Sequence, residues 1–106
     1  MATLHKETSV FHDIFNECDD DYVGLWSVYR QVKEAGFPDP KKVTIAFVYF
    51  LLSNRFVQAG VPDAKGDFLV WKENPEDAYQ KIIEEWSKLG REPDIGDIVW
   101  FTTPRT

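Results

Sequence analysis

Residues 40–55, with the sequence PKKVTIAFVYFLLSNR, decide the fold of this chain. Within this stretch, residues 45–52 are an unbroken run of eight apolar or aromatic residues. A segment that is apolar on every side is typical of a protein core, and eight residues are far fewer than the roughly 20 that a bilayer span needs. Asp39 is a favourable N-cap, and Pro40 suits the first helical position, where its missing N–H costs nothing.

The β-branched residues of this stretch also suit a buried strand, and periodicity alone does not separate the two structures. The length of the segment and its Asp-Pro start favour a helix. We therefore expect one long helix over residues 40–55, wrapped on most sides by other elements. In that position it is not free to read DNA bases.

The length of 106 residues corresponds to one domain with one core, so we expect a single domain over residues 1–106. Hydrophobic residues make up 43% of the chain and aromatic residues 15%, which indicates a packed globular protein. The single cysteine, Cys18, excludes an internal disulfide and a multi-cysteine zinc site. The N-terminal sequence has no export signal pattern, so we expect a cytoplasmic protein.

The chain has 12 basic and 18 acidic residues, which give a net charge of −6. Phosphate contacts supply most of the affinity in nucleic-acid binding, so an acidic chain is a poor candidate for it. The charge instead fits a partner protein with a basic surface. No segment indicates a membrane contact.

Three further segments have helical patterns. The first begins at a cap on Thr8 or Ser9 and ends in the acidic run 19–21, and we expect residues 1–7 to fray. The second covers residues 22–35 and ends at Gly36. The last begins with Asn74 as its cap and Pro75 in the first turn, and it continues to Gly90.

Strand patterns occur in the second half of the chain. Residues 56–61 and 68–71 predict a hairpin around a turn at residues 62–67. Residues 98–101 predict a last strand that adds to this hairpin. The expected fold is therefore α+β, with three N-terminal helices, a β-hairpin, a fourth helix and a C-terminal strand.

The order of the first five elements resembles a winged helix over residues 8–71. In that resemblance residues 36–39 form the tight turn before the third helix, and residues 61–67 form the wing tip. The resemblance is one of arrangement and carries no signature motif, and fold alone does not fix function. It implies DNA binding through the third helix and the wing, with these candidate residues: Lys41, Lys42, Thr44 and Lys65.

The segment between residues 13 and 21 contains five carboxylates and no basic residue, and these are Asp13, Glu17, Asp19, Asp20 and Asp21. They predict a docking surface for a basic partner, which they would attract by long-range steering. A solvated helix face that also supplies the cap of the next helix is the alternative interpretation.

Trp71 and Trp100 lie at or in predicted strands, where alternate side chains point to opposite faces. Ile98 with Trp100 and Val99 with Phe101 therefore face opposite sides of the sheet. Either the fourth helix covers the second side, or that side presents aromatic residues to a partner. We include both tryptophans in the candidate partner-binding set.

His12, Glu17 and Cys18 are candidates for a metal or nucleophilic site, but helical spacing separates the histidine from the cysteine. His5 lies in the segment that we expect to fray. With no converging acid, base and nucleophile, the sequence predicts no enzyme, metal or cofactor. A deep pocket containing His12 would reopen that question.

These patterns favour a small acidic protein-interaction module. One version is an inhibitor or immunity-type protein that neutralises a basic partner such as a nuclease. The alternative is a winged-helix transcriptional regulator that binds DNA. A homodimer through the aromatic sheet is also open.

Overall fold

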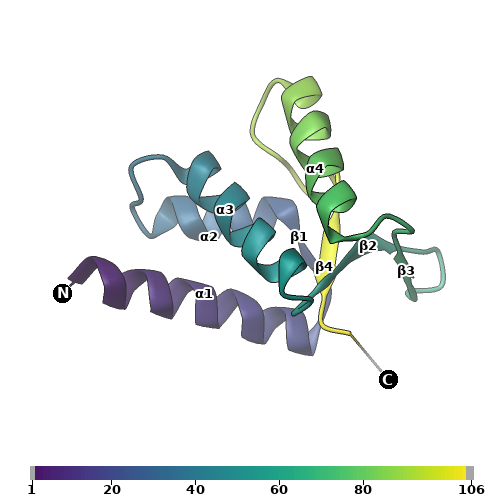
Figure 1. Cartoon of the computed structure of the whole chain (residues 1–106), viewed down its shortest axis with the longest axis horizontal. Helices are drawn as coiled ribbons and strands as arrows, with labels where there is room; N and C mark the ends of the chain where they lie inside the picture. Colours follow the sequence, from purple (N-terminus) through teal and green to yellow (C-terminus); the bar gives the residue numbers. More distant parts are fainter. Residues whose placement is uncertain (1, 105–106) are drawn as a thin grey trace.

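The predicted central helix is α3 (Pro40–Ser53), and the other elements are arranged around it (Figure 1). The computed structural model describes the backbone of residues 2–104 and the side chains of residues 9–104. Asp39 caps the helix, since its Oδ1 accepts a hydrogen bond from the N–H of Lys42 (3.3 Å), and Pro40 occupies the first turn. The helical interpretation of this stretch is therefore confirmed.

The fold is α+β, with four helices and a four-stranded antiparallel sheet in the order β1-β4-β2-β3 among the described residues. The remaining elements are α1 (Ala2–Asp20), β1 (Val23–Gly24), α2 (Leu25–Glu34), β2 (Gln58–Pro62), β3 (Phe68–Val70), α4 (Pro75–Leu89) and β4 (Trp100–Thr102).

The start of α1 differs from the prediction. The helix begins at Ala2, so the expected cap at Thr8 or Ser9 is wrong. The backbone of residues 2–7 lies within this helix, and the expected fraying of residues 1–7 stays a prediction. At its other end, α1 is joined to β4, because the C=O of Cys18 accepts hydrogen bonds from Thr103 N–H (3.1 Å) and Thr102 Oγ1 (3.3 Å).

A short strand, β1, precedes α2 where the sequence predicts the start of the helix at residue 22. Val23 pairs with Phe101 and Gly24 with Trp100, and the first helical N–H, of Leu25, donates to the C=O of Val99 (3.0 Å). Val23 and Gly24 therefore belong to the sheet, and the second helix does not begin directly after the acidic run. A two-residue strand has no periodicity that sequence patterns can detect.

The last strand adds to the hairpin as predicted, because β4 pairs antiparallel with β2. It begins two residues later than expected. Ile98 has a left-handed backbone (φ 67°), a conformation that a β-branched residue rarely adopts and that a strand excludes. The hairpin strands are also shifted at their ends, since Phe56 and Val57 belong to the turn after α3 and Trp71 follows β3.

The expectation that α3 is wrapped on most sides is wrong. Thr44, Phe47, Val48, Leu51 and Leu52 are buried, and α2 and α4 pack against the helix. Part of the remaining circumference is open, with Phe50 exposed by 50%. Tyr49, at the edge of the contact with Tyr79 of α4, is exposed by 39%. Because successive helical residues are rotated by about 100°, eight consecutive apolar residues surround the helix, and the neighbouring elements cover only part of that circumference.

The helix α4 has the predicted ends. Asn74 Oδ1 accepts from Asp77 N–H (2.8 Å), Pro75 lies in the first turn, and Gly90 follows with a left-handed backbone (φ 68°). It packs chiefly against α3, and its buried residues Ala78, Ile82 and Trp86 belong to the same core as Ala59 and Phe101 of the sheet.

The second face of the sheet carries Trp100. Val99 and Phe101 are fully buried, whereas Trp100 is half-buried on the other face, opposite Gly24 in β1 and Gly60 in β2. The ring of Trp26, from α2, also lies over Gly24. The two glycines make room for large rings, which shield part of this face.

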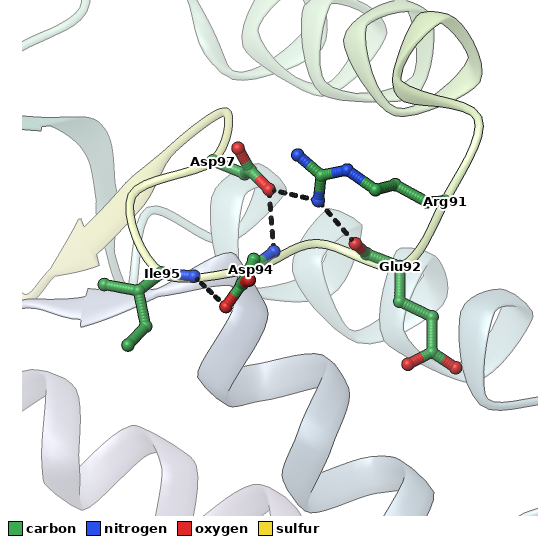
Figure 2. Close-up of polar contacts among 5 residues, drawn as sticks. All are labelled: Arg91, Glu92, Asp94, Ile95 and Asp97. Atoms are coloured by element: carbon green, nitrogen blue, oxygen red, sulfur yellow. Dashed lines mark hydrogen bonds and ion pairs between the residues drawn. The ribbon is translucent and has the colours of Figure 1, made fainter.

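The loop between α4 and β4 is held by its own side chains (Figure 2). Asp97 Oδ2 accepts from Arg91 Nη1 (2.8 Å) and from the N–H of Asp94 (2.7 Å), and these contacts lower the pKa of Asp97. Glu92 joins the loop to α2, because its Oε1 accepts from Lys33 Nζ (2.6 Å) and Tyr29 Oη (3.2 Å). This arrangement returns the chain to the sheet and positions β4.

We predict that Gly60→Ala destabilises the sheet. A Cβ at Gly60 would overlap with the carbonyl oxygen of Leu69 and lie 2.6 Å from Cε2 of Phe68, so the hairpin strands must separate. We expect a loss of about 2 kcal/mol in the free energy of unfolding, measured by urea denaturation.

Gly66→Ala is the matched control. Apart from Gly66 and its two chain neighbours, nothing lies within 4 Å of a Cβ at this position, but its φ of 88° makes alanine unfavourable by about 1 kcal/mol from the backbone alone. An equal or larger loss for Gly66→Ala than for Gly60→Ala would contradict the close contact between the strands.

Candidate protein-binding groove

A groove of about 390 Å³ lies between α1 and α3. Every side chain that lines it is apolar except that of one histidine. The lining residues are Phe11, His12 and Phe15 from α1, Phe47, Phe50 and Leu51 from α3, and Phe56 from the following turn. We call this feature the phenylalanine groove.

The floor of the groove joins α1 to α3. The rings of Phe11 and Phe47 stack with their centroids 4.0 Å apart and an interplanar angle of 8°. Phe47 and Leu51 are buried, whereas Phe11 and Phe15 are half-buried. Stacked aromatic pairs contribute about 1 kcal/mol beyond their area burial, so this floor is part of the folding core.

The walls of the groove are exposed. Phe50 is exposed by 50% and Phe56 by 43%, and their ring centroids are 5.6 Å apart. Phe56 is also 6.0 Å from Phe15 across the groove. The left-handed backbone of Arg55 (φ 59°) turns the chain so that the N–H of Phe56 donates to the C=O of Leu51 (2.9 Å). This turn holds the Phe56 ring beside α3.

The predicted acidic residues lie on α1 next to the groove. All five are exposed: Asp13, Glu17, Asp19, Asp20 and Asp21. On a helix, residues four apart lie on one row, so Asp19 continues the row of Phe11 and Phe15 at the end of the groove. Asp20 follows His12 and Asn16 on the adjacent row, and Asp13 and Glu17 lie further around the helix.

None of these five carboxylates forms an ion pair with the residues whose side chains the structure describes. Asp19 accepts from Thr103 Oγ1 (3.0 Å), and Asp21 accepts from the N–H of Tyr22 (2.8 Å). These neutral donors leave the negative charge of the surface in place. Among the side chains of residues 9–104, the outer face of α1 is therefore an acidic surface without an ion-pair partner.

The two predicted tryptophans lie apart from each other. Trp100 is half-buried on the second face of the sheet. Trp71 follows β3 and lines a separate pocket of about 420 Å³ between the sheet and the start of α4. Lys81 Nζ lies 4.1 Å from the centroid of the Trp71 ring and 3.1 Å from Glu73 Oε2. The ammonium group of this lysine therefore already covers one face of the ring. Neither tryptophan lines the phenylalanine groove.

The candidate DNA-binding residues do not form one surface. Thr44 is fully buried, and its Oγ1 has no hydrogen-bond partner in the described part of the chain, so its assignment to base contact is wrong. Lys41 and Lys42 are exposed at the start of α3, and Lys41 Nζ lies 5.2 Å from the ring of Trp86. Lys65 is exposed in the β2–β3 turn, which lies at the opposite end of the molecule (Figure 1).

His12 is exposed at the rim of the groove, and Asn16 Nδ2 lies 3.4 Å from its Nδ1. The groove has no other titratable lining residue, so His12 has no acid or base partner there. Cys18 is fully buried on the other side of α1, as helical spacing predicted. Within the described residues, no three His, Cys, Asp or Glu side chains are placed to hold a metal ion. His5 lies outside the described side chains.

The groove was not predicted from the sequence, because the uniformly apolar run of α3 indicates a helix that is buried on most sides. Phe11 and Phe15 stand at helical spacing with Ile14 and Cys18 in the sequence, a pattern that is typical of ordinary core packing. The available signal was an excess of large apolar residues, because Phe50 belongs to a run that is apolar around the whole helix and Phe56 follows that run. That signal alone does not show which side of a helix is exposed.

We predict that Cys18 does not react with thiol reagents in the folded protein. Burial, together with the charge of Glu17, raises the pKa of this thiol to about 12. At pH 8 only about one molecule in ten thousand carries the thiolate, which is the reactive form. Alkylation by iodoacetamide should therefore proceed at the rate of unfolding and become rapid in denaturant. Rapid alkylation of the native protein would show that α1 does not shield the thiol.

Comparisons of the chain with protein-family models, curated proteins and solved structures find no match. Within residues 2–104, no helix combines the length and apolar character that a membrane span requires. The function is therefore inferred from the groove and from the charges beside it.

Proposed function

We propose that this protein is a small acidic protein-interaction module. Its phenylalanine groove receives the apolar face of a helix from a basic partner, and the carboxylates of α1 contact the partner's cations. The observation that carries this proposal is an apolar groove with two half-exposed phenylalanines, Phe50 and Phe56, next to the acidic surface of α1.

The apolar part of the proposal follows from the shape of the groove. Single exposed apolar side chains are common on protein surfaces, but contiguous apolar patches mark interaction sites. A groove between two helices is the usual receptor for an amphipathic helix, which inserts bulky side chains at positions i, i+3, i+4 and i+7. Burial of the exposed halves of Phe50 and Phe56 would contribute about 1 kcal/mol each.

The charges indicate how the partner is oriented. The acidic residues lie on the α1 side of the groove, whereas the α3 side carries Lys42 on the same row as Ala46 and Phe50. A bound helix therefore places its basic residues over α1 and neutral or acidic residues over α3. Opposite charges of this kind accelerate association and exclude partners of the wrong sign.

An inhibitor or immunity-type protein is one concrete version of this function. A net charge of −6 and a small size suit a protein that covers the basic surface of an enzyme such as a nuclease. In this version the groove anchors the complex and the acidic surface blocks the positively charged site. If capture from the native host yields no protein partner at moderate salt, this version fails.

DNA binding through a winged-helix-like arrangement is the alternative. The order of elements supports it, but Lys41 and Lys42 are far from the Lys65 turn, and the chain is acidic overall. A salt-dependent mobility shift with duplex DNA that Lys41→Glu and Lys42→Glu together abolish would favour this alternative. The same result would count against the groove as the main functional site.

We predict that Phe50→Asp strongly weakens binding of a basic amphipathic helix. The probe is a synthetic helical peptide with leucines at positions i, i+3, i+4 and i+7, lysines along one flank of this stripe and glutamines along the other. Fluorescence anisotropy should give at least a tenfold weaker affinity for the variant, because a carboxylate replaces a central apolar anchor. Amide shifts in NMR spectra of the wild type should cluster at Phe11, Phe15 and Phe56.

Ile95→Asp is the matched control for that experiment. Ile95 is 70% exposed in the loop after α4 and does not line the groove, so the same type of exchange should leave the affinity unchanged. The groove is not the binding site if both variants lose affinity equally, or if the amide shifts fall on the sheet.

We predict that the acidic surface sets the association rate. The variant Asp13→Asn, Glu17→Gln, Asp20→Asn removes three exposed negative charges without touching the groove. Stopped-flow mixing with the same peptide should show about tenfold slower association at low salt and a weaker dependence on salt, with little change in dissociation. An unchanged association rate would restrict these residues to the role of a solvated helix face.

A further inference from the structure

The strand β3 is an edge of the sheet, with β2 on one side and no strand on the other among residues 2–104. The hydrogen bonds at the two ends of the hairpin show which residue pairs of β2 and β3 are hydrogen-bonded to each other. Trp71 N–H donates to the C=O of Ala59 (2.9 Å), and Asp63 N–H donates to the C=O of Asp67 (2.7 Å). Both pairs are therefore hydrogen-bonded positions of the antiparallel ladder.

Hydrogen-bonded and non-hydrogen-bonded positions alternate along such a ladder. Leu69, which lies opposite Val61 and midway between the two bonded pairs, therefore directs its N–H and C=O toward β2. Phe68 and Val70, on either side of Leu69, occupy non-hydrogen-bonded positions and direct their N–H and C=O groups away from β2. The open edge thus offers the two donors and two acceptors of Phe68 and Val70.

The side chains at this edge are apolar and exposed. Leu69 is exposed by 54% and Val70 by 49%, and Val61 on the neighbouring strand by 37%. Proteins usually protect an edge strand with lysine, proline or a covering element, and β3 itself has none of these residues. An apolar edge with free main-chain groups is a template for another strand.

A second copy of this chain is a suitable partner for the edge, because its charges are complementary and its outward N–H and C=O groups align with those of the first copy. Asp67 precedes β3 and Lys72 closely follows it, so antiparallel pairing of two copies brings the acidic end of one near the basic end of the other. Parallel pairing would bring like charges together. With Leu69 of the two copies opposite each other, Phe68 of each copy faces Val70 of the other, and all the outward main-chain groups find partners.

We propose that two copies of this protein associate through β3, antiparallel about a twofold axis that passes between the two Leu69 side chains. Four main-chain hydrogen bonds between Phe68 and Val70 join the sheets. The paired leucines bury each other together with Val61. The strand is short, so the association is weak and depends on concentration.

Sedimentation equilibrium of the full chain, from low micromolar to submillimolar concentration, tests the dimer. We expect a monomer–dimer equilibrium that Leu69→Lys weakens at least tenfold, because two lysines then face each other across the axis. Ile95→Lys makes the same kind of exchange at a more exposed aliphatic residue, and it should leave the equilibrium unchanged. A monomer at all concentrations overturns the proposal.

Amide hydrogen exchange measured by NMR tests the pairing itself. The amides of Phe68 and Val70 should exchange more slowly as the concentration rises, whereas the amide of Leu69, bonded to β2, should be protected at every concentration. A dimer that leaves Phe68 and Val70 unprotected, or that Phe50→Asp dissociates, uses another surface and overturns the assignment to β3.

Discussion

The fold depends on the burial of one side of α3. Phe47, Val48, Leu51 and Leu52 form the side that α2 and α4 cover, and the stack of Phe11 on Phe47 adds α1. An uninterrupted apolar run places large side chains around the whole helix, and a chain of 106 residues supplies covering elements for only part of it. The exposed wall of the groove at Phe50 is therefore a consequence of the same run that builds the core.

The features that sequence predicted well are local. The capped, proline-led starts of α3 and α4 and the glycine stop at Gly90 depend on a few neighbouring residues, and the structure has all of them. The acidic residues of α1 are exposed because they occupy the face of the helix that lies away from its apolar residues. Amphipathic helices with clear periodicity reveal their inner side from sequence alone.

The features that the sequence did not predict either depend on residues far away in the chain or lie in a segment without hydrophobic periodicity. The strand β1 exists because Val23 pairs with Phe101 and Gly24 with Trp100, 78 and 76 residues further along the chain. Two residues are too few for a sequence pattern that predicts this pairing. In α3 every position from 45 to 52 is apolar or aromatic, so no period distinguishes Leu51, which is buried, from Phe50, which is half exposed. The missed groove follows from this uniformity. The run also gives no inner side from which the burial of the preceding Thr44 could be predicted.

The two exposed apolar surfaces belong to different parts of the fold, which affects how the protein can bind. The phenylalanine groove is built by α1, α3 and the turn at Phe56, whereas the free edge belongs to β3 at the far side of the hairpin. Pairing through β3 therefore leaves the groove of each copy open. A dimer then presents two grooves with a fixed spacing. For a partner that carries two groove-binding segments, binding of the second segment becomes intramolecular once the first segment is bound. Under this arrangement a weak strand pairing strengthens binding without contributing any contact to the partner.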